Sequence, residues 1–368
     1  MNRRDLLKSS MAIPGLACIP LALSSMALGK RPTQDRRAPQ DRRTPVIDGM
    51  GEIRLEYPMP LIAEVIASGM SAVMITIGTP TLPEKEAYAN VLDELAAYEN
   101  HIDQHRKYFI KATTTADIEE AMKSKKLAIL YLFQNTTAIG KNMERLDFFY
   151  NFGVRSIQLT YNKRNLVGNG CMERVDGGLS EYGIQLIEAM NEKGIVVDLS
   201  HSGMQTMADA IKYAKAPPVI SHSGCTSVYD HQRATTDKNI KALADKGGVM
   251  GIFQINPNLG PKQRNTLDDF LKHIDYCVKI GGIDCVGIGS DREHQTIPDT
   301  AEEIKRLEEE MALVGATSVH WPFFLSELNH GRRMETIRQG LEKRGYTSGQ
   351  IAKIMGGNFY RVYQAVIG

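Results

Sequence analysis

The sequence reads Ile195-Val196-Val197-Asp198-Leu199-Ser200-His201 and, after a helix-like segment over 203–214, Pro218-Val219-Ile220-Ser221-His222. Each apolar run has the length of a buried strand and ends in Ser-His. A helical crossover of this length makes the two strands parallel neighbours, so both imidazoles are expected at one edge of a sheet. Chemistry in α/β proteins is assembled at that edge. The pair therefore predicts metal ligands or proton carriers, although one such histidine alone is more often a satisfied loop residue.

Strand-like apolar runs alternate with amphipathic segments from Pro45 onward. The strand-like runs cover 46–47, 71–77, 127–133, 154–160, 195–199, 218–220, 249–255 and 285–288. The helix-like segments include 60–68, 87–101, 116–123, 182–193, 238–244 and 267–280. Eight apolar runs that are mostly non-alternating and separated by helices predict a (β/α)8 barrel of the TIM type in the α/β class. A doubly wound open sheet is the alternative. Residues 292–333 show no regular pattern, and helical segments follow them.

The composition is that of a soluble protein with a large core. The chain has 368 residues, of which 42% are hydrophobic and 24% charged, and its formal net charge is +1. Proteins that bind nucleic acids usually carry a strong basic bias, so this class is excluded. The five cysteines include no CxxC pair, and neither a disulfide nor a structural zinc site is predicted.

The N-terminus has the layout of an export signal. Arg3 and Arg4 precede an apolar run from Met11 to Leu28, which predicts a twin-arginine signal over 1–29 and a periplasmic location. Prolines and a glycine interrupt the run, which disfavours a spanning helix. A lipid anchor at Cys18 is the minor alternative. Residues 30–44 are basic and lack aliphatic side chains, so they predict a flexible linker, and 45–368 predict the catalytic domain.

Polar side chains follow the predicted strands. His201, His222 and Asp291 form a His-His-Asp set that suits Zn²⁺ or a similar divalent ion. Glu52 adds a carboxylate and Gln134 a neutral oxygen. The residues placed just after strands are Asp48 to Glu52, Thr79, Gln134, Tyr161, His201, His222, Gln254 to Asn256, and Asp291.

Arg233 lies in the loop Asp230-His231-Gln232-Arg233, after the second histidine. A guanidinium there suits a substrate carboxylate, which it can bind through two parallel hydrogen bonds, and an exposed loop arginine is the alternative. No Gly-x-Ser-x-Gly elbow and no glycine-rich phosphate loop is present. Serine nucleophile chemistry is therefore not predicted.

At these residues the chain resembles the membrane (renal) dipeptidase family of zinc metallopeptidases, which are amidohydrolase-like barrels. The resemblance rests on the segments 196–201, 219–223, 286–291 and 356–359. It implies a two-metal site that activates water against a dipeptide amide. His201 and His222 would hold one ion, Asp291 would act at the other, and Arg233 would receive the substrate carboxylate.

Three positions depart from the family pattern. The usual Asp-Gly-His-Asn-Asp is Asp48-Gly49-Met50-Gly51-Glu52 here, so Met50 replaces a metal histidine and Glu52 an aspartate. Gln134 replaces the bridging glutamate, and a neutral bridge compensates poorly for the repulsion between two dications. Tyr161 replaces a histidine that steadies the intermediate, and its hydroxyl is a weaker donor.

The sequence thus predicts a metallopeptidase of dipeptidase type. It is expected to hold one Zn²⁺ at His201 and His222, with a second ion in doubt. Asp291 is the expected proton carrier, and Tyr161 and Arg233 contact the substrate. Hydrolysis of another amide or a lactam is one alternative, and a non-catalytic binding protein on the same scaffold is the other. The expected partner is a dipeptide or other small molecule. Monomer and homodimer stay open, and membrane contact is expected only through the N-terminus.

Overall fold

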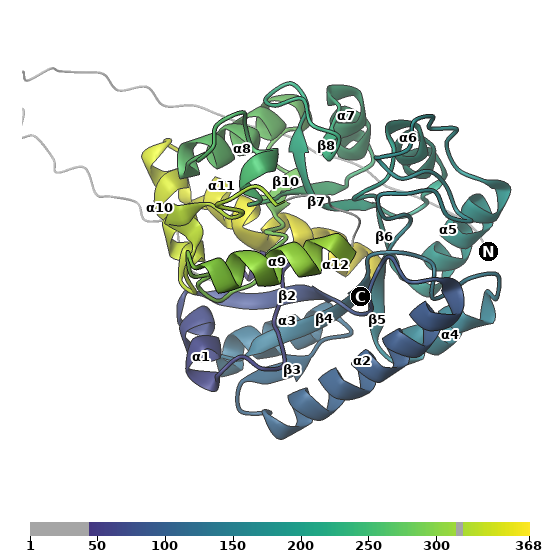
Figure 1. The fold of residues 1–368 in the computed structure, drawn as a ribbon, viewed down its shortest axis with the longest axis horizontal. Helices are drawn as coiled ribbons and strands as arrows, with labels where there is room; N and C mark the ends of the chain where they lie inside the picture. Colours follow the sequence, from purple (N-terminus) through teal and green to yellow (C-terminus); the bar gives the residue numbers. More distant parts are fainter. Residues whose placement is uncertain (1–43, 314–318) are drawn as a thin grey trace, which may run out of the picture. The chain divides into compact units, whose positions relative to one another are not determined.

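Parallel strands close into a barrel in the order β2-β1-β10-β9-β7-β6-β5-β4, and β4 pairs back to β2 (Figure 1). The computed structural model describes residues 44–313 and 319–368. The predicted export signal and the linker up to residue 43 lie outside these ranges. The barrel strands are β1 (Val46–Asp48), β2 (Met70–Thr76), β4 (Leu127–Phe133), β5 (Val154–Gln158), β6 (Val196–Asp198), β7 (Val219–Cys225), β9 (Val249–Ile252) and β10 (Val286–Ile288).

Each of these strands coincides with one of the eight predicted runs, so the predicted barrel is confirmed and the open sheet is wrong. Two short strands escaped prediction: β3 (Phe109–Lys111) pairs with β4, and β8 (Ala234–Thr235) pairs with β7. The strand prediction is also wrong about where β7 ends. His222 lies inside this strand, which continues to Cys225.

Helices surround the barrel (Figure 1). They are α1 (Met59–Ala67), α2 (Glu84–Gln104), α3 (Thr115–Ser124), α4 (Glu144–Asn151), α5 (Glu181–Lys193), α6 (Met204–Tyr213), α7 (Asp237–Asp245), α8 (Leu267–Gly281), α9 (Ala301–Leu313), α10 (Arg333–Lys343), α11 (Ser348–Ala352) and α12 (Asn358–Ile367). Local signals set their ends. Ser180 Oγ accepts a hydrogen bond from the Gly183 N–H at the start of α5, and Gly194, with φ 75°, ends that helix.

Helix α9 corrects the expectation that residues 292–333 are irregular. Leu307 is buried in this helix, whereas the charged residues beside it are exposed or half-buried, so the apolar stripe is too narrow to be read from the sequence. Ion pairs also stabilise this helix. Arg306 pairs with Glu303 and Glu310 within the helix, and with Glu293 in the loop after β10.

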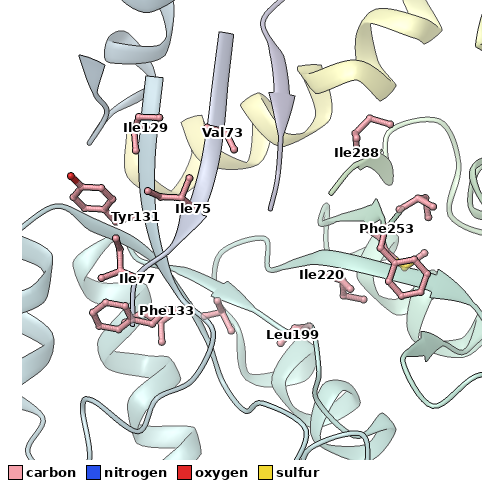
Figure 2. Packing of buried hydrophobic residues seen from close by; sticks show 14 of the residues in the cluster. Val73, Ile75, Ile77, Ile129, Tyr131, Phe133, Leu199, Ile220, Phe253 and Ile288 are labelled. Carbon is pink, nitrogen blue, oxygen red and sulfur yellow. The ribbon is translucent and has the colours of Figure 1, made fainter. Parts of the chain in front are cut away.

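The main core lies between the strands and the outer helices. Figure 2 shows Val73 and Ile75 of β2 beside Ile129 and Tyr131 of β4, and the register pairs Val73 with Ile129 and Ile75 with Tyr131. These residues alternate with a second set that faces the barrel interior, because successive strand side chains point to opposite faces. The second set packs against α3 and α12.

Helix α12 packs against the barrel strands through Phe359. The ring lies so close to Gly49 and Gly287 that a Cβ at either position would come within 2.2 Å and 2.6 Å of it, respectively. Tyr363 and Val362 of the same helix join the interior cluster. No helix within the described ranges has both the length and the apolarity required to cross a bilayer.

Candidate active site

His201 and His222 converge at the carboxyl edge of two neighbouring strands. Strands β6 and β7 are parallel, with Asp198 opposite Val219. His201 follows β6 in a turn where its φ is 60°, and His222 points from inside β7. Their Nε2 atoms lie 2.9 Å apart, and both residues are buried. The structure thus brings the two predicted ligands together on one point.

The other ring nitrogen of each histidine has its own partner. His201 Nδ1 lies 2.7 Å from Asn162 Oδ1, and His222 Nδ1 lies 2.9 Å from Ser221 Oγ. Ser221 Oγ donates to Asp198 Oδ2 at 2.5 Å, so this oxygen is free to accept the proton on His222 Nδ1. These partners favour a proton on each Nδ1, which leaves a lone pair on each Nε2 for a cation that binds between them.

Both imidazoles are neutral near pH 7. Burial holds the pKa of His201 well below its usual range, and the Arg233 charge together with the repulsion that a second protonated imidazole would meet at His222 lowers it further. Burial and Arg233 do the same to the pKa of His222. The neutral imidazole is the form that ligates metal ions.

Asp291 follows β10 and is the nearest carboxylate. Its Oδ2 lies 3.9 Å from His222 Nε2, and its backbone, like that of His201, has a positive φ, here 54°. Burial raises the pKa of Asp291 to about 7, although Arg233 opposes this shift. A carboxyl group that exchanges its proton near neutral pH suits general acid and base chemistry.

Glu52 and Met50, which follow β1, differ in environment. Burial raises the pKa of Glu52 to about 8, against the lowering effect of Arg54. Its backbone pairs with that of Glu293 in an isolated bridge. Met50 is 2% exposed and packs in the apolar interior of the barrel. This position has therefore become part of the core.

Tyr161 and Arg233 flank the histidines. The Tyr161 ring stacks on His201 with centroids 4.1 Å apart, and burial raises the pKa of its phenol, which stays protonated. Arg233 is 8% exposed, and its Nη2 donates weakly to the His222 carbonyl at 3.5 Å. Gln134 follows β4 and is 8% exposed, and its backbone carbonyl accepts from Gln158 Nε2 at 2.7 Å.

The candidate metal donors are the two imidazoles and the Asp291 carboxylate. In residues 44–313 and 319–368, no three or more His, Cys, Asp or Glu side chains are grouped closely enough to hold a metal ion. Two Nε2 lone pairs at 2.9 Å nevertheless repel each other unless a cation or a proton lies between them, and Asp291 is the third donor nearby. For a second ion the sequence predicts Glu52, Asp291 and neutral Gln134, while Met50 takes the place of an imidazole.

Sequence reasoning missed the partners of the histidines. Asp198 and Ser221 lie in the quoted segments, but nothing in the pattern shows that they contact each other. Asn162 is far from His201 in the sequence, and no spacing signal points to it. A cavity of about 850 Å³ beside this region also went unpredicted. It is lined by residues of the 170–176 loop, the start of α6, the loop between β7 and β8, and the start of α7.

Comparisons with known proteins agree with this geometry. A model of the membrane dipeptidase family (Peptidase family M19) matches residues 61–320. An uncharacterized dipeptidase of Schizosaccharomyces pombe is 35% identical over 172 residues, which make up 45% of this chain but only 41% of that relative. An amidohydrolase from Pseudomonas aeruginosa is similar in structure, with a TM-score of 0.77 and 29% identity over 88% of this chain and 97% of that one.

A metallo peptidase from Rhodobacter sphaeroides, solved with a phosphinate mimic of the dipeptide L-Ala-D-Ala, shares the fold. Its TM-score is 0.74 at 18% identity, over 88% of this chain and all of that chain. The family match runs from α1 to beyond β10, so it includes His201, His222, Arg233 and Asp291, whereas the altered segment at Met50 precedes it. With this match over most of its length and a closed parallel barrel of the same kind, the chain belongs to the membrane dipeptidase family, Peptidase family M19.

Proposed function

We propose that this protein is a metal-dependent hydrolase that cleaves the amide bond of a dipeptide or of a related small amide. The observation that carries the proposal is the pair of neutral, buried imidazoles whose Nε2 atoms lie 2.9 Å apart, with the Asp291 carboxylate 3.9 Å from one of them. His201, His222 and Asp291 would hold a single divalent ion of the zinc type. Such an ion supplies Lewis acidity, which polarises an amide carbonyl and makes water more acidic.

Asp291 is proposed to move the protons. Its carboxyl group lies 3.9 Å from His222 Nε2, beside the proposed ion, where it can accept a proton from the attacking water and then return it to the leaving nitrogen. The left-handed backbone at this residue holds the carboxyl group close to His222 rather than along the strand. Both steps use the same carboxyl group, so it ends each cycle in its starting form.

Tyr161 and Arg233 are proposed to bind the substrate. The protonated phenol of Tyr161 can donate a hydrogen bond to the carbonyl oxygen as negative charge develops on it. Arg233 carries the positive charge that acts on Asp291, Tyr161 and both histidines. A guanidinium in this place suits the free carboxylate of a dipeptide.

Purified full-length protein tests this function directly. After removal of metal with a chelator and addition of Zn²⁺, we expect release of free amino acids from a panel of dipeptides, and we expect His201→Ala to abolish it. The absence of turnover in zinc-loaded protein, for dipeptides and for small amides and lactams, would reject the hydrolase.

The second candidate is a binding protein that has lost hydrolysis. It is favoured by one observation: Met50 is buried among apolar side chains and Gln134 is uncharged, so the second metal position lacks the imidazole and the bridging carboxylate of the family pattern. This candidate predicts saturable binding of dipeptides, measured by calorimetry, without any product.

Export by the twin-arginine route is also proposed, because Arg3 and Arg4 precede a short, interrupted apolar run. Changing both arginines to lysine should leave the protein in the cytoplasm, which fractionation of producing cells measures. A double variant that reaches the periplasm at the normal level would remove the twin-arginine assignment.

A further inference from the structure

The hydrogen bonds on the Nδ1 atoms of His201 and His222 carry an inference that rests on the proposed metal site. The two histidines are oriented by different groups from different segments. An amide oxygen contacts one ring and a hydroxyl backed by a carboxylate contacts the other. None of these three side chains faces the point where the Nε2 atoms meet.

Several hydrogen bonds fix Asn162 and its loop beside His201. The residue is 8% exposed, and its carbonyl oxygen accepts the Met172 N–H at 3.0 Å. Its Oδ1 accepts from His201 Nδ1 at 2.7 Å and from the Cys171 thiol at 3.6 Å. The Cys171 N–H in turn donates to the His201 carbonyl at 2.7 Å. The loop that follows β5 therefore contacts His201 twice: Asn162 binds the imidazole ring, and Cys171 binds the backbone carbonyl.

Gly170 allows the loop to pack this closely on itself beside His201. A Cβ at this position would lie 2.1 Å from the Tyr161 carbonyl oxygen and 2.3 Å from the Asn162 carbonyl carbon. The glycine also pairs with Ser202 in an isolated bridge, next to His201. Only a residue without a side chain lets the two arms of the loop approach so closely.

Ser221 contacts the Nδ1 atom of His222, as Asn162 contacts the Nδ1 atom of His201. Its hydroxyl donates to Asp198 Oδ2, and Asp198 Oδ1 accepts the backbone N–H groups of Ser200 and Ser221, each at 3.0 Å. Burial raises the pKa of Asp198, and these hydrogen bonds oppose the rise. An ionised Asp198 can only accept hydrogen bonds. Ser221 therefore donates its hydroxyl proton to Asp198 and accepts the Nδ1 proton of His222.

We propose that Asn162 and Ser221 are positioning residues that hold both imidazoles as Nδ1–H tautomers and aim both bare Nε2 atoms at one cation. Without these acceptors each ring can flip or carry its proton on Nε2. A protonated Nε2 has no lone pair and cannot bind the metal ion. Loss of such an oxygen typically weakens metal binding by about 10- to 100-fold. Asp198 acts through Ser221 and touches neither ring.

Zn²⁺ affinity of the full-length protein, measured by competition with a chromophoric chelator, tests the role of Asn162. Asn162→Leu removes the acceptor at similar volume and should weaken Zn²⁺ binding about 10- to 100-fold. Asn162→Asp keeps an acceptor and should bind at least as tightly as the unmodified protein. Thr160→Val is the matched control, because Thr160 is also buried in this loop and its hydroxyl donates to Ser202 Oγ at 3.1 Å instead of to an imidazole. It should leave the affinity unchanged.

The same measurement applies to the second histidine. Ser221→Ala should weaken Zn²⁺ binding by a similar factor, and Ser221→Thr should largely restore it because the hydroxyl returns. Ser156→Ala is the control, since this buried serine of β5 donates its hydroxyl to the Val196 carbonyl at 3.4 Å. Equal losses for Ser221→Ala and Ser156→Ala would show a general packing effect and overturn the role of Ser221.

The tautomers supply a readout that does not depend on turnover. Long-range ¹H–¹⁵N spectra of Zn²⁺-loaded protein should show Nδ1–H for both histidines, and a shift of the His201 signal toward Nε2–H in Asn162→Leu at the same Zn²⁺ concentration. An Nε2–H tautomer at His201 or His222 in the Zn²⁺-loaded unmodified protein, or Zn²⁺ binding by Asn162→Leu as tight as in the unmodified protein, would overturn the proposal. Protein that binds Zn²⁺ with the expected tautomers but hydrolyses nothing would reject the proposed function alone.

Discussion

His201 and Asp291 share an uncommon backbone conformation. Among the described residues other than glycine, positive φ angles occur at Lys125, His201 and Asp291, and Lys125 merely ends helix α3. The left-handed region costs a residue with a Cβ roughly 1–2 kcal/mol. Each of these site residues lies three positions after the end of a barrel strand, and each side chain comes close to His222. Local strain of this kind is concentrated at functional sites.

The substrate carboxylate is expected to bind Arg233. Arg233→Lys keeps the charge but loses the planar pair of donors, so KM for free dipeptides should rise by about 10- to 100-fold, from the loss of roughly 1.5–3 kcal/mol. Steady-state kinetics on a dipeptide and on its C-terminal amide measure this. If the unmodified protein handled both substrates equally well, Arg233 would have no such role.

The metal content is expected to be about one divalent ion per chain after dialysis, because two imidazole Nε2 atoms meet at one point of the candidate site. His201→Ala should remove it. The double variant Met50→His and Gln134→Glu should raise the content toward two, since it restores an imidazole and a bridging charge. Elemental analysis measures all three proteins. Two tightly held ions in the unmodified chain would contradict the single-ion site.

At the scale of elements, helix α8 shows how a capping group stabilises the outer layer. Asp269 Oδ2 accepts the N–H and the hydroxyl of Thr266 at 3.0 Å and 3.1 Å, and Lys262 Nζ lies 2.8 Å from the same oxygen. Burial raises the pKa of Asp269, but these hydrogen bonds and that from Lys272 outweigh it and hold the pKa below its usual range. The carboxylate therefore stabilises the fold when ionised.

Asp269→Asn is expected to lower the free energy of unfolding at pH 7 by about 1–2 kcal/mol. Because the folded pKa is depressed, the stabilisation is fully present above the unfolded pKa, near 4, and is lost as the pH falls below it. The difference between variant and unmodified protein should shrink accordingly toward pH 2. Denaturant unfolding at several pH values measures it.

Asp245→Asn is the control, since its ion pair with Lys241 is exposed on both sides and should contribute less than about 0.5 kcal/mol. A difference for Asp269→Asn that stayed constant down to pH 2 would mean that the carboxylate charge is not what stabilises α8.

For the whole molecule, the barrel interior depends on the C-terminal helix. Phe359 is fully buried and fills the space that Gly49 of the β1 end and Gly287 of β10 leave open. Strands that are separated by most of the sequence thus share one aromatic ring. The interior set would be incomplete without the last residues of the chain.

Phe359→Ala should destabilise the protein by about 3–5 kcal/mol, because it leaves a cavity among close-packed strands. Gln364→Ala on the exposed face of the same helix is the control and should change stability little. Denaturant midpoints compare the two variants. A Phe359→Ala protein as stable as the control would show that α12 contributes little to the core.

The sequence by itself was sufficient for the barrel and for the histidine pair. Eight short apolar runs with helices between them are local features, and a crossover of limited length leaves parallel neighbours as the favoured arrangement. His201 and His222 could be predicted to meet because each belongs to such a run. Helix α9 and the strands β3 and β8 could not, since ion pairs or a single partner strand stabilise them rather than a strong apolar pattern.

Only the tertiary structure decided what surrounds the site. Met50 belongs to the interior core, and the hydrogen-bond partner of His201 is Asn162, which is distant from it in the sequence. Both facts depend on which way a strand end or a loop turns in three dimensions. Strand alternation and hydrogen-bond partners across the barrel are set by register and by contacts between distant segments, and neither leaves a periodic trace in the sequence.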